Sequence, residues 1–149
     1  MSYPSCPGLE AVLFDLDGTL VDSAPDLAAA LNRLLAGAGY PPVALADVQR
    51  MIGDGVPKLV ERGFAAAGRA LSEDEIDTFA RRFVADYEPN ATVATRPFPG
   101  AIEALAELKA AGLALGVCTN KPEAATRTIL AAFGMDAFFA AVVGGDTLP

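Results

Sequence analysis

The chain has 149 residues, of which 52% are hydrophobic and 20% charged, a composition typical of a folded globular protein. Its formal net charge of -8 disfavours nucleic acids and anionic membranes as partners. Histidine is absent, which excludes Ser-His-Asp and Cys-His mechanisms and zinc sites built on imidazole.

The cysteines and the first residues favour a cytoplasmic location. Cys6 and Cys118 are far apart, so a disulfide framework is not expected, and Cys118 ends an apolar run typical of a small buried residue. Residues 1–10 lack the basic and long apolar segments of a signal peptide. No run approaches the roughly 18 apolar residues of a membrane span. We therefore expect a soluble cytoplasmic protein without a membrane partner.

The first elements are a strand and a helix. Residues 11–14 form a short apolar run, which predicts a parallel strand covered on both faces. Ser23 is expected to cap the following helix, with Pro25 in its first turn and Asp26 completing a capping box. Apolar residues at helical spacing continue this helix to Gly37.

Residues 40–92 carry helix signals and no convincing strand. One helix is expected after Gly53-Asp54-Gly55, and another from Ser72, where Glu75 supplies a capping box. This helical block is too long for a single crossover between strands. We interpret it as a separate lobe inserted just after the loop that follows the first strand.

The remaining residues alternate helices and strands. In chain order they are a hinge at 96–100, a helix, a strand at 113–118, a helix opened by Pro122, and a strand at 140–143. Strands separated by helices predict a parallel sheet, hence an α/β, Rossmann-like fold. We expect residues 1–20 with 96–149 to form the α/β core and residues 21–95 to form an all-helical cap.

Two carboxylates follow the first strand. Side chains at i and i+2 of an extended chain point the same way, so Asp15 and Asp17 would repel each other unless a cation lay between them. A hard, oxygen-rich site favours Mg²⁺. In open parallel sheets, ligands bind beyond the carboxyl ends of strands, and Gly18 lets the backbone turn close to a ligand. Asp15 and Asp17 are therefore candidate metal ligands.

Two other interpretations of this loop are weaker. A calcium loop requires glycine at its sixth position and glutamate at its twelfth, where this chain has Leu20 and Asp26. A simple turn accounts for Asp17-Gly18 but leaves Asp15 without a role.

At these residues the chain resembles the haloacid dehalogenase-like phosphohydrolases. Residues 12–23, VLFDLDGTLVDS, resemble the first motif of that superfamily. Residues 52–56, IGDGV, in a helical cap and residues 117–122, VCTNKP, extend the similarity over nearly the whole chain. Within the superfamily it most resembles bacterial phosphoglycolate phosphatases, which implies a core of the haloacid dehalogenase type with a helical cap.

The resemblance implies Mg²⁺-dependent hydrolysis of a small phosphorylated metabolite, 2-phosphoglycolate to glycolate and phosphate. Asp15 would attack phosphorus and form an aspartyl-phosphate, and Asp17 would act as general acid and then general base. An Asp15 carboxylate oxygen and the Asp17 main-chain carbonyl would hold the metal. Gly18 and Thr19 are expected among the phosphate-binding residues. An aspartate at position 17 argues against dehalogenation.

A second phosphate-binding segment is expected at Thr119-Asn120-Lys121. A hydroxyl and backbone N–H groups near a helix start can cradle phosphate. Thr119 and Asn120 alone would read as a helix cap, but together with the first motif they favour phosphate binding. Lys121 is not clearly equivalent to the catalytic lysine of the family, so a solvent-facing lysine remains an alternative.

The cap supplies candidates for substrate selection. The loop Gly53-Asp54-Gly55 is either an inter-helix turn or, by the resemblance, a loop that closes over the active site. Lys58 and Arg62 lie on one helical face and could attract the carboxylate of a small acid, or simply face solvent.

The resemblance also implies a third motif with a lysine and a fourth with acidic magnesium ligands, and neither precedes Pro149. Asp146 fits the residue before the third motif better than a replacement ligand. We therefore expect an incomplete core and a fragment of a longer phosphatase, active or inactive alone, and monomeric or homodimeric when whole. A sugar phosphate, pyrophosphate or nucleotide substrate, a phosphomutase reaction and a non-catalytic module remain alternatives.

Overall fold

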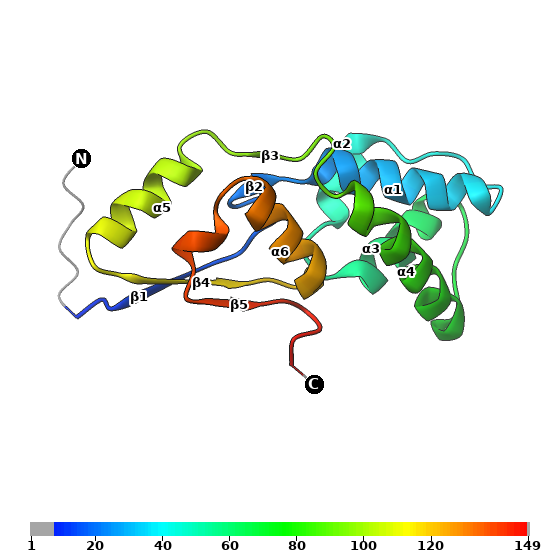
Figure 1. Ribbon diagram of the computed structural model, residues 1–149. Helices are drawn as coiled ribbons and strands as arrows, with labels where there is room; N and C mark the ends of the chain where they lie inside the picture. Colours follow the sequence, from blue (N-terminus) through cyan, green and yellow to red (C-terminus); the bar gives the residue numbers. More distant parts are fainter. Residues whose placement is uncertain (1–7, 149) are drawn as a thin grey trace.

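A three-stranded parallel sheet organises one half of the molecule (Figure 1). The computed structural model describes residues 8–148. The strands β1 (Ala11–Phe14), β4 (Ala114–Cys118) and β5 (Ala141–Val143) lie in the order β1-β4-β5. Phe14 pairs with Val117, which in turn pairs with Val142. The carboxyl ends of β1 and β4 therefore meet at one edge of the sheet.

Helices α5 (Ala101–Ala110) and α6 (Glu123–Ala132), with the short η2 (Asp136–Phe138), lie on the same side of this sheet (Figure 1). Leu105 and Ile129 are fully buried between the helices and the strands. The α/β fold with a parallel sheet is thus confirmed.

The other face of the sheet corrects two expectations. Side chains alternate between the faces of a strand, so Leu115 and Val117 are buried while Leu13 is 71% exposed. Leu13 lies opposite Gly116, where an added Cβ would be 2.7 Å from a Leu13 methyl carbon. Cys118 shares the alternation of Gly116 and is exposed. The predictions that the first strand is covered on both faces and that Cys118 is buried were therefore wrong.

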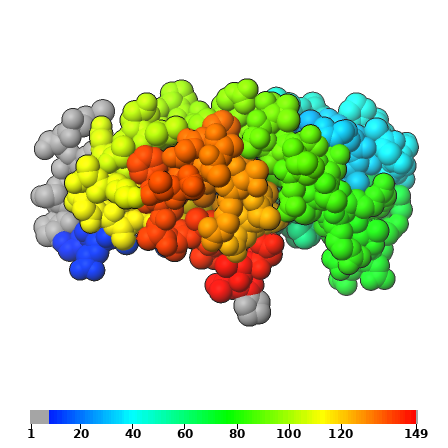
Figure 2. Space-filling view, viewed as in Figure 1, coloured from blue at the N-terminus to red at the C-terminus, as the bar shows by residue number. Residues whose placement is uncertain are grey.

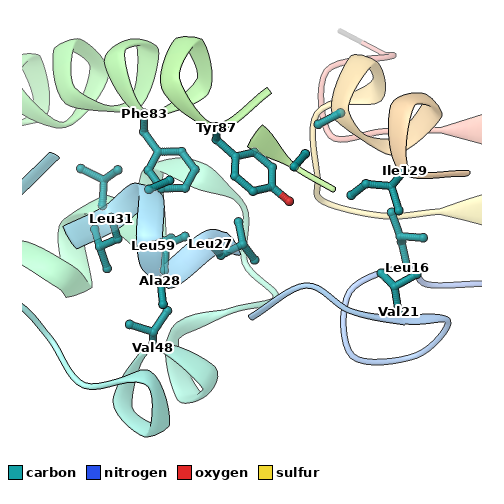
Figure 3. Close-up of a cluster of buried hydrophobic side chains, with 14 of the residues drawn as sticks. Leu16, Val21, Leu27, Ala28, Leu31, Val48, Leu59, Phe83, Tyr87 and Ile129 are labelled. Carbon is teal, nitrogen blue, oxygen red and sulfur yellow. The ribbon is translucent and has the colours of Figure 1, made fainter. Parts of the chain in front are cut away.

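Four helices form the other half of the molecule: α1 (Ala24–Gly37), α2 (Leu45–Met51), α3 (Val56–Ala66) and α4 (Glu73–Tyr87), followed by η1 (Glu88–Asn90). Leu31, Phe64 and Phe83 are fully buried between them (Figure 3 labels two of these). The capping box predicted at Ser72 is confirmed, because the Glu75 N–H donates to Ser72 Oγ at 3.3 Å and the Ser72 N–H donates to Glu75 Oε2 at 3.0 Å.

A short antiparallel ribbon joins the two halves. It pairs β2 (Val21–Asp22) with β3 (Arg96–Pro97). The segment that leaves the sheet half therefore lies beside the segment that returns to it. We place the proposed division between core (1–20, 96–149) and cap (21–95) at this ribbon. Figure 2 shows the cap helices at one end of the molecule, with α6 (orange) against the green segment that holds η1.

Asp26 ties the start of the cap to its end. Its buried carboxylate accepts hydrogen bonds from the Ala94 N–H, the Thr95 N–H and Thr95 Oγ1, all between 2.8 and 2.9 Å. Ser23 does begin α1, but its side chain makes no capping hydrogen bond. The predicted Ser23–Asp26 capping box is therefore wrong. Ser23 donates instead to Asp17 in the loop after β1, and Asp26 accepts from residues about 70 positions further along the chain.

We expect Asp26→Ala to lower the free energy of unfolding by about 3 kcal/mol, because it leaves buried donors without an acceptor. Asp86→Ala is the matched control, since Asp86 pairs with Arg33 on the surface at 2.7 Å and its loss should cost under about 1 kcal/mol. Urea unfolding followed by circular dichroism measures both. Equal losses in the two variants would contradict the role assigned to Asp26.

The features noted at the N-terminus, Cys6 included, lie outside the described residues. Within residues 8–148, every helix is too short or too polar to cross a lipid bilayer.

Candidate active site

The loop after β1 presents the two aspartates. Leu16, between them, is fully buried and anchors the loop, and its carbonyl accepts hydrogen bonds from the N–H groups of Thr19, Leu20 and Val21. Gly18 has φ +76°, a conformation that glycine adopts without strain, and it completes the turn. Asp15 Oδ1 accepts the Leu16 N–H at 2.7 Å, which fixes the carboxylate of Asp15 at the strand end.

The end of the neighbouring strand presents Thr119 and Lys121 beside this loop. The Thr119 N–H donates to the Val143 carbonyl at 3.0 Å, which continues the pairing of β4 with β5. Thr119 is 8% exposed, and its Oγ1 accepts the Lys121 N–H at 3.2 Å. Since β1 and β4 are adjacent and parallel, these residues and the two aspartates lie at the same edge.

Lys121 forms a buried ion pair with Asp17. Its Nζ lies 3.1 Å from Asp17 Oδ1 and 3.2 Å from Oδ2, with the two side chains 3% and 13% exposed. Ser23 Oγ also donates to Asp17 Oδ1, at 2.5 Å. Burial lowers the pKa of the Lys121 ammonium, and the Asp17 carboxylate opposes that change. The alternative in which Lys121 faces solvent is therefore wrong.

A pocket between the two halves of the molecule contains these groups. The sheet half contributes Asp15, Asp17, Thr119, Asn120 and Lys121 to its lining, and the cap contributes Leu27, Ile52, Gly53, Gly55, Val56, Leu59 and Tyr87. Asn120 Nδ2 donates to the Gly53 carbonyl at 2.8 Å across the pocket. The cap loop therefore contacts the edge of the sheet that carries the two aspartates. This contact favours the interpretation of residues 53–55 as a loop that closes over the site.

Five of the residues predicted for the site lie outside this pocket lining: Gly18, Thr19, Asp54, Lys58 and Arg62. Gly18 and Thr19 form the turn behind Asp17 and are exposed. Arg62 pairs with Asp54 at 2.6 Å and donates to the Met51 carbonyl, while Lys58 pairs with Glu61 at 2.6 Å. The structure thus brings Gly53 and Gly55 to the site but directs the charges of Lys58 and Arg62 to partners within the cap.

Tyr87 is a pocket residue that the sequence reasoning missed, because it was counted in the apolar face of its helix. It is 2% exposed, and Lys121 Nζ lies 4.5 Å from its ring centroid. Its hydroxyl has no hydrogen-bond partner. The sequence did contain a signal for this role: Tyr87 is the last residue of an amphipathic helix, and a buried tyrosine needs a partner for its hydroxyl.

The described residues supply some of the oxygen donors that a hard cation prefers. Within residues 8–148, no three acidic or cysteine side chains come together in a metal-binding cluster. Asp15 and Asp17 still supply hard oxygen donors at the pocket. Lys121 and Ser23 donate hydrogen bonds to the Asp17 carboxylate, so the main-chain carbonyl of Asp17 is the better candidate ligand for a cation. Asp146 instead accepts the Glu123 N–H at 2.7 Å, at the start of α6.

Comparison with known proteins places this chain in a family. The model of the haloacid dehalogenase-like hydrolases matches residues 9–149. The chain is similar to phosphoglycolate phosphatases of Cereibacter sphaeroides, 46% identical over 95% of this chain and 65% of that protein, and of Caulobacter vibrioides, 46% identical over 93% and 58%.

A solved structure described as a predicted phosphoglycolate phosphatase from Haemophilus somnus superposes with a TM-score of 0.87 at 38% identity, over 97% of this chain and 66% of that one. The chain spans less than two thirds of the length of the two curated relatives. The resemblance noted in the sequence is confirmed: the chain belongs to the haloacid dehalogenase-like hydrolases.

Proposed function

We propose that the protein is a magnesium-dependent phosphatase that hydrolyses a small phosphate monoester, 2-phosphoglycolate, to glycolate and phosphate. The observation that carries this proposal is the convergence of Asp15, Asp17, Thr119 and Lys121 in one pocket beneath the cap. The names of the curated relatives support the choice of substrate.

Asp15 is the proposed nucleophile. Its carboxylate lies at the open end of β1, and the Leu16 N–H holds one oxygen so that the other can attack phosphorus. The P–O bond to the alcohol then breaks, and the leaving oxygen takes a proton from Asp17, which must carry that proton, as it does after each turnover, when the substrate binds. This step leaves the phosphoryl group on Asp15 and a carboxylate on Asp17.

Asp17 then acts as the base in the second step. It removes a proton from a water molecule that attacks the phosphorus of the aspartyl-phosphate, which releases phosphate and restores the Asp15 carboxylate. Ser23 and Lys121 hold the Asp17 side chain in place by hydrogen bonds from two directions. This orientation explains why the two aspartates have different roles although they are only two positions apart.

The phosphate oxygens are expected to lie between the loop after β1 and the end of β4. Thr119, Asn120 and Lys121 provide a hydroxyl, an amide and an ammonium on that side of the pocket. A buried ammonium stabilises developing negative charge strongly, because little water screens it. Magnesium, held by Asp15 and the Asp17 carbonyl, would reduce the repulsion between the anionic nucleophile and the anionic substrate.

A phosphate-release screen tests the proposal on the product of the complete reading frame. We expect 2-phosphoglycolate to exceed glucose 6-phosphate, pyrophosphate and a nucleoside monophosphate by at least about tenfold in kcat/KM, because the mostly apolar cap side chains in the pocket offer a sugar, a second phosphate or a nucleoside few polar partners. Chelation of divalent cations should abolish release, and added Mg²⁺ should restore it. Equal rates on all four compounds would contradict the substrate assignment.

A cytoplasmic location remains a prediction, as does a monomeric or homodimeric state. Size-exclusion chromatography with light scattering of the same product decides the oligomeric state.

A further inference from the structure

Within residues 8–148, the Tyr87 hydroxyl is the one buried side-chain nitrogen or oxygen atom without a hydrogen-bond partner, and Tyr87 lines the pocket. Tyr87 is 2% exposed, so bulk solvent does not reach its hydroxyl. A buried hydroxyl without a partner costs about 1–3 kcal/mol. A phenylalanine would fill the same space without this cost, which suggests that the hydroxyl has a partner that arrives with the substrate.

The position of Tyr87 indicates which part of a substrate it meets. Tyr87 ends α4 and stacks on Phe83, with ring centroids 5.6 Å apart, on the cap side of the pocket. Figure 3 shows its oxygen directed away from Phe83, toward the side where Leu16 and Ile129 of the sheet half lie. Phosphorus must approach Asp15 on the sheet side, so the alcohol portion of a monoester extends toward the cap and Tyr87.

The surroundings of this hydroxyl leave it without an acceptor from the protein, which a substrate carboxylate could supply. The other side chains that the cap places in the pocket, Leu27, Ile52, Val56 and Leu59, are apolar. The Lys121 ammonium, which pairs with Asp17, lies against the Tyr87 ring, 4.5 Å from its centroid. Burial and the nearby carboxylates of Asp17 and Asp26 raise the pKa of the Tyr87 hydroxyl, so it stays protonated and acts as a donor.

We propose that Tyr87 is a specificity-determining residue whose hydroxyl donates a hydrogen bond to the carboxylate of the substrate's leaving group. The substrate class is a short phosphorylated hydroxy acid, and the proposal rests on the proposed function. Tyr87 thereby distinguishes such an acid from an alcohol of equal size. The hydroxyl remains unpaired until that carboxylate enters the pocket.

Tyr87→Phe tests the proposal, because it removes the hydroxyl and keeps the ring on Lys121. The paired substrates are 2-phosphoglycolate and ethyl phosphate, in which a methyl group replaces the carboxylate. We expect Tyr87→Phe to lower kcat/KM by about 10- to 100-fold for 2-phosphoglycolate and by less than about twofold for ethyl phosphate. Its melting temperature should be unchanged or higher, whereas a structural hydroxyl would lower it on removal.

Tyr40→Phe is the matched control, since Tyr40 packs against Phe64 and Arg69 in the cap and does not line the pocket. It should leave kcat/KM for both substrates unchanged. Equal losses on both substrates in Tyr87→Phe, or no loss on either, would overturn the assignment.

Calorimetric binding to proteins that carry Asp15→Asn separates this proposal from the proposed function. Weaker binding of 2-phosphoglycolate, but not of ethyl phosphate, after adding Tyr87→Phe supports the Tyr87 contact even if the unmodified enzyme hydrolyses neither compound. In that case the proposed function fails and the contact stands. Absence of 2-phosphoglycolate binding in the Asp15→Asn protein overturns both.

Discussion

Asp15→Asn is expected to lower phosphate release by at least about 10⁴-fold while leaving the fold intact. The amide oxygen of asparagine is a poor nucleophile, so no aspartyl-phosphate can form. Asp15 is exposed and accepts a hydrogen bond from the neighbouring Leu16 N–H, a contact that asparagine can retain. The melting temperature should therefore change little, and a phosphate-release assay with thermal unfolding measures both effects.

Asp22→Asn is the control for this substitution. Asp22 lies in the same segment and accepts the Ala24 N–H at 3.3 Å, but it does not line the pocket with Asp15. It should retain activity within about threefold, as expected of a residue outside the chemistry. An Asp15→Asn protein that keeps more than a few per cent of wild-type activity would remove Asp15 as the nucleophile.

Lys121→Met should lower kcat/KM by about 10²- to 10³-fold, the usual cost of losing one aimed charge in a catalytic site. Methionine fills the same buried space, so the loss reports the ammonium rather than the volume. Two effects add: the phosphate loses a cation, and Asp17 loses one of the donors that orient it. Steady-state kinetics on 2-phosphoglycolate measure the loss.

Lys58→Met provides the matched control for charge. Lys58 carries the same ammonium, but it pairs with Glu61 on the surface of α3 and lies outside the pocket lining. Its removal should change kcat/KM by less than about twofold, as expected for an exposed ion pair. If Lys121→Met were as active as Lys58→Met, Lys121 would be a structural residue and not part of the reaction.

The sequence predicted the sheet and the meeting of its loops because both follow from local pattern and strand pairing. Residues 11–14 and 113–118 are short apolar runs separated by helical segments, which requires parallel pairing. Parallel pairing alone brings Asp15 and Thr119 to one edge. Coverage of the strands could not be predicted in the same way, since Leu13 is apolar and yet lies on the open face.

The residues that sequence reasoning misjudged have distant partners. The spacing of Ser23 and Asp26 fits a capping box, but Asp17 and Thr95 take their side chains in the folded chain. Tyr87 reads as one more apolar position until the cap turns its oxygen toward the sheet half. Lys121 had two open interpretations, and only its burial beside Asp17 excludes solvent exposure.

The most direct test of the account is to trap the covalent intermediate. Nitrophenolate leaves without a proton donor, so an Asp17→Asn protein given p-nitrophenyl phosphate should complete the first step and stall for lack of a base. Acid quenching and peptide mass spectrometry should then show one phosphoryl group on Asp15. A phosphoryl group on another residue, or an unmodified Asp15 peptide after a burst of nitrophenolate, would contradict the account.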